Sequence, residues 1–393
     1  MRIALLAPLP PEQNGIADYA NNFRQALMAL GIEVVTPLQG KAVSGSNVGQ
    51  VLNSVDWEGI DLIHAELGGG RLTEFLALRE LRKRLPGVPM TATVHDPERI
   101  VWRREQLPWP LTLLERLPSP LPQAAVVLAD PLTLREERQL ARSLDRIVTL
   151  TNTGAQCLSH RMQLEPGKVA VIHHGNLPIP AAPLPPLEPL RLLYFGFIYR
   201  GKGIEDLIHA LANLFATQPE LRQRVRLTLA GGTSAEMAFA GKANYLQQLE
   251  QQIAELDLTH AIDWKLNLPA QEIAATIQAH HVMVLPYRES KKLSLLGRQR
   301  GTSGALSWAA ACGRGAITSN ARSFAEEVSH GNGSLFRQGD VASLAEELLK
   351  LAKAPELAQG WADRAQAIGT ERLWANTARH FYDIFSTLMD HRA

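Results

Sequence analysis

One segment constrains the fold of this 393-residue chain most strongly: Tyr194–Leu211, with the sequence YFGFIYRGKGIEDLIHAL. An apolar strand ends at Phe195, a glycine-rich turn follows, and an amphipathic helix begins near Ile204. In an open α/β sheet, ligands bind at the carboxyl ends of the strands, where a helix N-terminus adds partial positive charge. Arg200 and Lys202 add two cations to this turn. The segment predicts a strand–turn–helix unit that binds an anion, most simply a diphosphate; the alternative is an ordinary loop with solvated charges.

The same alternation of strands and helices continues along the chain. Apolar runs predict strands at residues 3–7, 33–36, 62–65, 90–95, 146–150, 169–173, 191–195, 226–230, 262–265, 282–285 and 316–319. Amphipathic periodicity predicts helices at residues 17–30, 73–85, 204–217, 242–256, 270–280, 304–312, 341–353 and 371–390. Strands that alternate with helices indicate parallel sheets covered on both faces.

A proline-rich segment divides the chain into halves of similar size. Six prolines fall within Asn176–Leu190, where they stiffen the backbone and exclude a helix. We therefore predict an N-terminal domain over residues 1–177, a linker over 178–190, a C-terminal domain over 191–370, and a closing helical segment over 371–393. Both domains are expected to be doubly wound and Rossmann-like, and to face a central cleft.

Composition excludes several classes of protein. The formal net charge is +1, so no global positive field favours nucleic acid as a partner. The two cysteines, Cys157 and Cys312, form neither a disulfide framework nor a metal-ligand pattern, which fits a reducing cytoplasm. No apolar run reaches the length of a membrane span, and the first one is too short for a signal peptide. Leu107–Pro122 suits either a membrane-touching or acceptor-shaping loop or, as we prefer, a loop packed on the first domain.

Polar residues at predicted strand ends mark a candidate site in the first half. Gly15 follows the first strand, where it permits close approach of a ligand. His95 and Asp96 end one strand, and His64 and Glu66 end its predecessor, so the four share a rim that suits an acceptor pocket. The first turn lacks the G-x-G-x-x-G fingerprint, which disfavours a nicotinamide-dependent oxidoreductase.

A second anion site is predicted in the segment RQRGTSGALSWAAACGRG. Thr302 or Ser303 can cap a helix that begins near Gly304. The amides of Ser303, Gly304, Ala305 and Leu306 would then form an anion cradle. The cations Arg298 and Arg300 precede it, although a solvated surface loop is the alternative for such a basic run. Since motifs for metalloproteases, P-loops and paired CxxC sites are absent, no metal or other cofactor is expected.

Taken together, these motifs resemble the retaining glycosyltransferases with the GT-B fold, namely glycosyltransferase family four, whose C-terminal domain is of the group one type. The resemblance extends over nearly the whole length. It rests on Asn14–Gly15, His95 at a strand end, VIHHGN with His174, the turn Gly196–Gly203, LAGG with Gly232, VLPY, and CGRGAITS.

The resemblance implies a metal-independent hexosyltransferase that uses a nucleoside diphosphate sugar. It implies a closing helix that packs on the N-domain and three sets of site residues. Catalytic roles fall on His95, Arg200 and Lys202. Acceptor contacts fall on His64, Glu66, Asp96 and His174. Donor contacts fall on Gly15, Gly196, Arg200, Lys202, Gly232, Lys265, Glu289, Arg300, Ser303, Gly304, Ala305 and Leu306.

The sequence departs from the family pattern at three positions. Phe197 stands where the family has an arginine after the first glycine of the turn, and Arg200 is expected to take its role. Arg300 and Trp308 stand where the family has two glutamates, and Glu289 is the nearest acid. We therefore expect a cytoplasmic glycosyltransferase, either free in the cytoplasm or at the inner face of the membrane. It is expected to act on a glycan, lipid-linked or other acceptor in bacterial polysaccharide or glycoconjugate synthesis. The alternatives are a non-catalytic scaffold or partner subunit and a GT-B epimerase or phosphorylase.

Overall fold

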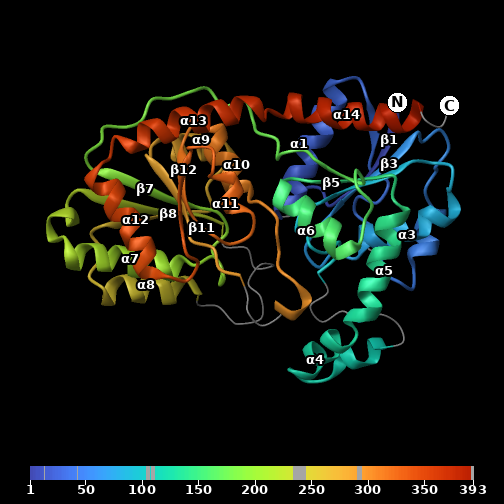
Figure 1. The fold of residues 1–393 in the computed structure, drawn as a ribbon, viewed down its shortest axis with the longest axis horizontal. Coiled ribbons are helices and arrows are strands. Elements are labelled where there is room, and N and C mark those ends of the chain that lie inside the picture. Colours follow the sequence, from blue (N-terminus) through green and yellow to red (C-terminus); the bar gives the residue numbers. More distant parts are fainter. Residues whose placement is uncertain are drawn as a thin grey trace. The chain divides into compact units, whose positions relative to one another are not determined.

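The chain forms two compact units in a computed structural model that describes residues 1–12, 14–41, 43–102, 107, 111–232, 245–289 and 294–390 (Figure 1). The first unit consists of residues 1–175, 291–302 and 374–393, and the second of residues 176–290 and 303–373. Each unit contains one six-stranded parallel sheet, as the alternating pattern predicts. The first unit is therefore assembled from three separate stretches of the chain.

The sheet of the first unit has the strand order β2-β1-β3-β4-β5-β6. Its strands are β1 Arg2–Leu6, β2 Glu33–Val35, β3 Leu62–Leu67, β4 Met90–Val94, β5 Arg146–Thr149 and β6 Val169–Val171. Strands β3 and β4 are buried throughout, because both are central and the chain covers both of their faces.

The helices of the first unit are α1 Gly15–Ala29, α2 Val48–Asn53, α3 Thr73–Arg84, α4 Leu121–Leu128, α5 Asp130–Ser143, α6 Asn152–Met162 and α14 Trp374–Asp390, with short 3-10 helices η1 Leu111–Arg116 and η3 Ser294–Leu296. The side chain of Asn14 caps α1 by accepting from the amide of Ala17 at 2.9 Å. The loop expected over residues 107–122 contains η1 and the start of α4; residues 103–106 and 108–110 lie outside the described residues.

The last helix, α14, packs along α1 within the first unit (Figure 1). Its rings meet those of α1: Phe381 lies 4.5 Å from Phe23, and Trp374 lies 4.9 Å from Tyr19, between ring centroids. These aromatic side chains are buried, so the end of the chain completes the core of the first unit.

The sheet of the second unit has the order β12-β11-β10-β7-β8-β9. Its strands are β7 Leu190–Phe195, β8 Val225–Gly231, β9 Ile262–Leu266, β10 Val282–Leu285, β11 Gly315–Ser319 and β12 Gly333–Phe336. Its helices are α7 Ile204–Thr217, α8 Tyr245–Glu255, α9 Ala270–Gln278, α10 Gly304–Ala311, α11 Phe324–Glu327, α12 Val341–Lys353 and α13 Leu357–Glu371, with the 3-10 helix η2 Pro219–Arg222. The helices α7 and α12 have the predicted bounds, whereas β12 and α13 were not predicted.

The proline-rich segment is fastened to the second unit by a buried arginine. Arg314 donates to the carbonyl oxygens of Ala182 at 3.1 Å and Pro183 at 2.9 Å, and its Nε donates to His280 at 2.8 Å. Burial lowers the pKa of Arg314. Proline has no backbone N–H, so this segment can form few backbone hydrogen bonds of its own. The guanidinium of Arg314 donates to its carbonyl oxygens instead and so holds the extended backbone in place.

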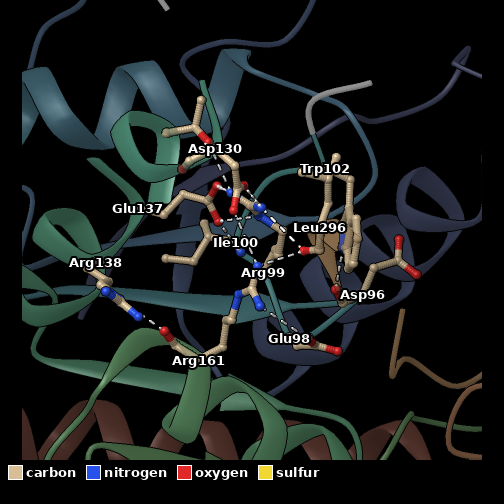
Figure 2. Close-up of polar contacts among 11 residues, drawn as sticks. Asp96, Glu98, Arg99, Ile100, Trp102, Asp130, Glu137, Arg138, Arg161 and Leu296 are labelled. Atoms are coloured by element: carbon tan, nitrogen blue, oxygen red, sulfur yellow. Dashed lines mark hydrogen bonds and ion pairs between the residues drawn. The ribbon is translucent and has the colours of Figure 1, made fainter. Parts of the chain in front are cut away.

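The short stretch 294–302 is fastened to the first unit by a buried ion-pair network (Figure 2). Arg99 donates to Glu137 at 2.7 Å, forms an ion pair with Asp130, and donates to the carbonyl of Leu296 at 3.3 Å. Arg161 donates to the same carbonyl at 3.0 Å. Buried guanidinium groups need such partners, so the network fixes this stretch on α5 and α6.

None of the helices within the described ranges is both long enough and apolar enough to span a bilayer.

Candidate functional site

The glycine turn of the second unit is tied to the end of β8. Gly196 donates its amide to Ala230 at 3.1 Å, and Ile198 donates to Gly232 at 3.0 Å. Gly231 has a φ of 155°, and a Cβ there would lie 1.7 Å from the carbonyl oxygen of Gly196. Glycine is therefore required where the two strand ends approach each other.

Tyr287 joins the turn to the tip of α10. Lys202 places its Nζ 3.6 Å from the centroid of the Tyr287 ring. The hydroxyl of Tyr287 lies 3.1 Å from Oγ of Ser303, within hydrogen-bonding distance. The amide of Arg288 donates to the carbonyl oxygen of Gly201 at 3.0 Å, which holds the glycine turn against the segment that follows β10. The structure thus brings a cation and a helix N-terminus to one buried tyrosine.

Tyr287 itself was not assigned a role from the sequence. Burial raises the pKa of Tyr287, so its side chain is a neutral phenol. Its hydroxyl can donate a hydrogen bond to Ser303 or accept one from it. The signal that could have found it is an aromatic residue two positions after a fully buried strand, β10, at the carboxyl edge of the sheet.

The tip of α10 forms as predicted, but fewer amides are available than expected. Ser303 caps the helix: its Oγ accepts from the amide of Ala305 at 3.3 Å. Its carbonyl accepts from the amide of Leu306 at 2.9 Å. In the part of the chain that the structure describes, this leaves the amides of Ser303 and Gly304 without an acceptor. An anion at this tip would meet those two donors.

Arg200 turns its side chain toward α8. Its guanidinium lies 5.2 Å above the ring of Tyr245 and donates to the side chain of Gln248. Its role on a diphosphate stays a prediction. Lys265 is exposed on the edge strand β9, where it pairs with Ala230 of the adjacent strand β8. Its donor contact also stays a prediction.

The residues at and near the family's glutamate positions have other structural partners. Trp308 packs edge-on against Phe195 at the end of β7, with 6.4 Å between ring centroids. Glu289 accepts the amide of Arg322 at 2.9 Å. Arg300 belongs to the first unit, where its amide donates to Pro97 at 2.8 Å. The donor contacts predicted for Glu289 and Arg300 stay predictions.

In the first unit, Glu66 joins His64 and His95 in one network. His95 Nε2 lies 2.7 Å from Oε2 of Glu66, and His64 Nε2 lies 3.2 Å from its Oε1. Hydrogen bonds and charge from both histidines outweigh desolvation and lower the pKa of Glu66 to about 2. His64 and Glu66 are buried, whereas the side chain of His95 is 10% exposed. The strand rim predicted from the sequence therefore reaches the surface through His95.

The Glu66 carboxylate orients the imidazole of His95. A carboxylate only accepts, so Nε2 of His95 carries the proton in this contact. Its Nδ1 is the ring nitrogen that has no partner among the described residues. The ring also packs edge-on against Tyr19 with 4.7 Å between centroids. His95 is thus held rigidly with one nitrogen available to a ligand.

Two other predicted residues of this unit, Asp96 and His174, contact backbone groups. Asp96 accepts the amide of Gly69 at 3.1 Å, and His174 directs Nδ1 to the carbonyl of Gly175 at 2.8 Å. Gly15 is the exposed first residue of α1, and an added Cβ would meet none of the described atoms within 4 Å. The acceptor contacts of Asp96 and His174 and the donor contact of Gly15 stay predictions.

Replacing Glu66 with glutamine should lower the free energy of unfolding at pH 7 by roughly 3 kcal/mol, the linkage value of a pKa lowered from 4.5 to about 2. A lowered carboxyl pKa stabilises the fold above pH 4.5, and this contribution is lost as the pH falls toward 2. Urea denaturation of both proteins between pH 7 and pH 3 measures it. The gap between wild type and variant should narrow below pH 4.5, whereas the exposed control Glu33→Gln should show little gap at any pH. An equal gap at pH 7 and pH 3 would contradict this assignment.

The described residues contain no group of three or more His, Cys, Asp or Glu side chains placed to hold a metal ion.

Comparison with known families places both halves of the chain. Residues 178–368 match the family described as Glycosyl transferases group 1, and residues 37–175 match Glycosyltransferase Family 4. The chain is 28% identical over 271 residues to D-inositol 3-phosphate glycosyltransferase of Streptomyces bingchenggensis, a match to 64% of this chain. This match spans 55% of that protein's length. A D-inositol 3-phosphate glycosyltransferase 2 of Catenulispora acidiphila is 24% identical over 437 residues, with 100% of this chain and 96% of that protein covered.

Solved structures share the architecture. Sucrose-phosphate synthase from Thermosynechococcus elongatus superimposes with a TM-score of 0.70 at 17% identity, covering 100% of both chains. HepE of Anabaena in complex with UDP superimposes with a TM-score of 0.68 at 17% identity, covering 98% of this chain and 100% of that one. At these identities the likeness concerns the fold alone. With two parallel α/β units and matches to both family descriptions, this chain belongs to the family-four glycosyltransferases of the GT-B fold.

Proposed function

We propose that this chain is a retaining glycosyltransferase that moves a hexose from a nucleoside diphosphate sugar to a glycan, lipid-linked or other acceptor. The observation that carries the proposal is the convergence of Lys202 and the α10 tip on Tyr287. A cation and two helix-tip amides at the carboxyl edge of a parallel sheet suit a diphosphate. Two of the similar solved structures are complexes with UDP and with UDP-glucose, which supports a donor of this class.

The chemistry follows from where negative charge develops. As the glycosidic bond to the donor phosphate breaks, the leaving diphosphate gains charge, and Lys202 with the amides of Ser303 and Gly304 would stabilise it. We propose that the leaving phosphate oxygen accepts the proton of the acceptor hydroxyl, so the new bond forms on the same face of the sugar. These protein donors would supply the positive charge without a bound metal. His95, oriented by Glu66, would contact a hydroxyl or phosphate through Nδ1.

The setting of the reaction is part of the same proposal. We propose a cytoplasmic enzyme of bacterial polysaccharide or glycoconjugate synthesis, which would work in the cytoplasm itself or at the inner face of the membrane.

Calorimetry against UDP-, GDP-, ADP- and dTDP-sugars tests the donor proposal. One of them should bind, with an affinity that Lys202→Ala weakens by roughly tenfold or more, because a charge-assisted contact to phosphate is lost. A matched lysine control is Lys353→Ala, at the exposed end of α12, which should bind as wild type does. Absence of binding across the panel would overturn the proposal.

A non-catalytic scaffold or partner subunit is a second candidate. Trp308 and Arg300 occupy the two positions where the family has glutamates, and Trp308 packs on Phe195. Product analysis with the donor, with and without added acceptors, tests this candidate. A donor that binds but is neither transferred nor hydrolysed would favour it.

A further inference from the structure

A cavity of about 580 Å³ lies in the first unit between α5, α6 and the stretch 294–302. Its lining includes Arg138 from α5, Cys157 and Arg161 from α6, and Glu98 and Arg300 from the loops. None of the residues predicted as acceptor contacts lines it, and of the predicted donor contacts Arg300 alone does. The cavity therefore needs an explanation of its own.

The charge around the cavity is positive. Three arginines line it against one carboxylate, Glu98. Arginine forks pair with phosphate through two parallel hydrogen bonds, and several of them match the double negative charge of a phosphate better than the single charge of a carboxylate.

The carboxylates near this cavity are already engaged. Oε2 of Glu98 accepts the amide of Arg298 at 2.8 Å, and Glu98 also lies 3.9 Å from Arg161. Asp130 pairs with Arg99 and lies 3.5 Å from Arg161. These contacts are built by the stretch 294–302 and the network around Arg99 (Figure 2). They neutralise Arg161 in part, and among the described residues they leave the charge of Arg138 unbalanced.

Arg138 is held at the cavity by a contact with the backbone of α6. Its Nε donates to the carbonyl of Arg161 at 3.0 Å, which fixes the direction of the guanidinium (Figure 2). Within the described ranges, no carboxylate lies within ion-pair distance of Arg138. Nε of Arg161 is also buried without an acceptor there. Donors of this kind are satisfied by an anionic ligand.

We infer that this cavity binds a phosphomonoester, with Arg138 as its principal contact. The volume exceeds that of inorganic phosphate and falls within the range of small-molecule sites, so an organic moiety accompanies the phosphate. Leu134 and the aliphatic stems of the arginines would cover that moiety. The site is distinct from the diphosphate site proposed around Lys202, and the inference does not depend on catalysis.

Cys157 provides a reporter inside the cavity. The chain has two cysteines, and Cys312 is buried, so a small thiol reagent reports on Cys157. Burial raises the pKa of Cys157 despite the charge of Arg300, so the rate is measured at a fixed, mildly alkaline pH. The variant Cys157→Ser gives the background rate.

The experiment measures the rate of Cys157 modification in the full chain with glucose 6-phosphate, inorganic phosphate, glucose or UDP added at constant ionic strength. Glucose 6-phosphate should slow the reaction saturably, inorganic phosphate should do so at higher concentration, and glucose should have no effect. In Arg138→Gln, half-protection should need roughly tenfold more glucose 6-phosphate or more, because a charge-assisted pair is lost. The matched control Arg135→Gln, an exposed arginine on α5, should behave as wild type does.

The inference would be overturned by no protection by either phosphate compound, by equal protection in Arg138→Gln, or by equal protection by glucose. Donor calorimetry on Arg138→Gln separates this site from the proposed function. Unchanged donor binding with lost protection supports two sites. If UDP protects Cys157 and Arg138→Gln abolishes donor binding, the cavity belongs to the donor and the inference fails. Failure of donor binding in wild type, with phosphate protection intact, would instead count against the proposed function alone.

Discussion

Replacing Lys202 with alanine should lower the turnover of hexose transfer by about 10²–10³-fold, the usual cost of removing one preorganised donor to a developing charge. The ammonium group projects from the glycine turn and lies 3.6 Å from the centroid of the Tyr287 ring. That ring holds the ammonium group at the glycine turn, where we expect it to contact the diphosphate. Steady-state kinetics at saturating donor measure the effect.

The same substitution should leave the fold intact. A cation–π contact of this kind contributes about 0.5–1 kcal/mol, so the urea midpoint should move little. Lys202→Arg keeps a cation at the turn and should recover part of the lost turnover, whereas Lys353→Ala should match wild type. Turnover of Lys202→Ala within a few-fold of wild type would remove Lys202 from the mechanism.

Replacing Gly203 with alanine should destabilise the second unit by more than about 4 kcal/mol, which few single substitutions reach. An added Cβ would lie 1.8 Å from the carbonyl oxygen of Pro286, a backbone atom that cannot move aside without disturbing Tyr287. Gly203 also has a φ of 70°, which an alanine adopts only with strain. Urea denaturation, followed by the fluorescence of tryptophans that include Trp264 and Trp308, measures the loss.

Gly201→Ala is the matched control two residues earlier. Its φ is 96°, but an added Cβ there would meet none of the described atoms within 4 Å. This variant should lose about 1–2 kcal/mol from backbone strain alone. The difference between the two variants then isolates the close approach at Pro286, and equal losses would show that the approach is not a packing constraint.

Much of the fold follows from local pattern in the sequence. The strand β10 and the helices α7 and α12 have the bounds that their apolar periodicity predicts, and Ser303 caps α10 as expected. The helices α4 and α5 were not predicted. For α4 the local signal is weak, because the helix begins with a proline at the edge of the stretch 107–122 that reads as a loop. The short edge strand β12 is only partly buried, and so it lacks the apolar run that marks the other strands.

The candidate site could be predicted only in part, because its contacts join residues far apart in sequence. The glycine turn and the helix tip each carry a local signature, but their link through Tyr287 depends on the pairing of β7 with β10. Likewise, the strand ends pointed to His64, Glu66 and His95, whereas the burial of Glu66 between two histidines depends on the register of β3 with β4. The cavity beside Arg138 needs the stretch 294–302, which lies more than 150 residues further along the chain.

The discontinuous make-up of the first unit has a consequence for the chain as it is synthesised. A nascent chain that has passed residue 175 already holds all six strands of the first sheet, but it lacks α14 and the stretch 294–302. Until α14 emerges from the ribosome, Tyr19 and Phe23 on α1 have no Trp374 or Phe381 to cover them. A fragment cut at the first boundary would expose that apolar face to solvent and to chaperones. Dissecting this protein into separately expressed halves should therefore yield an aggregating N-terminal piece, and permuted or full-length chains are the forms suited to experiment.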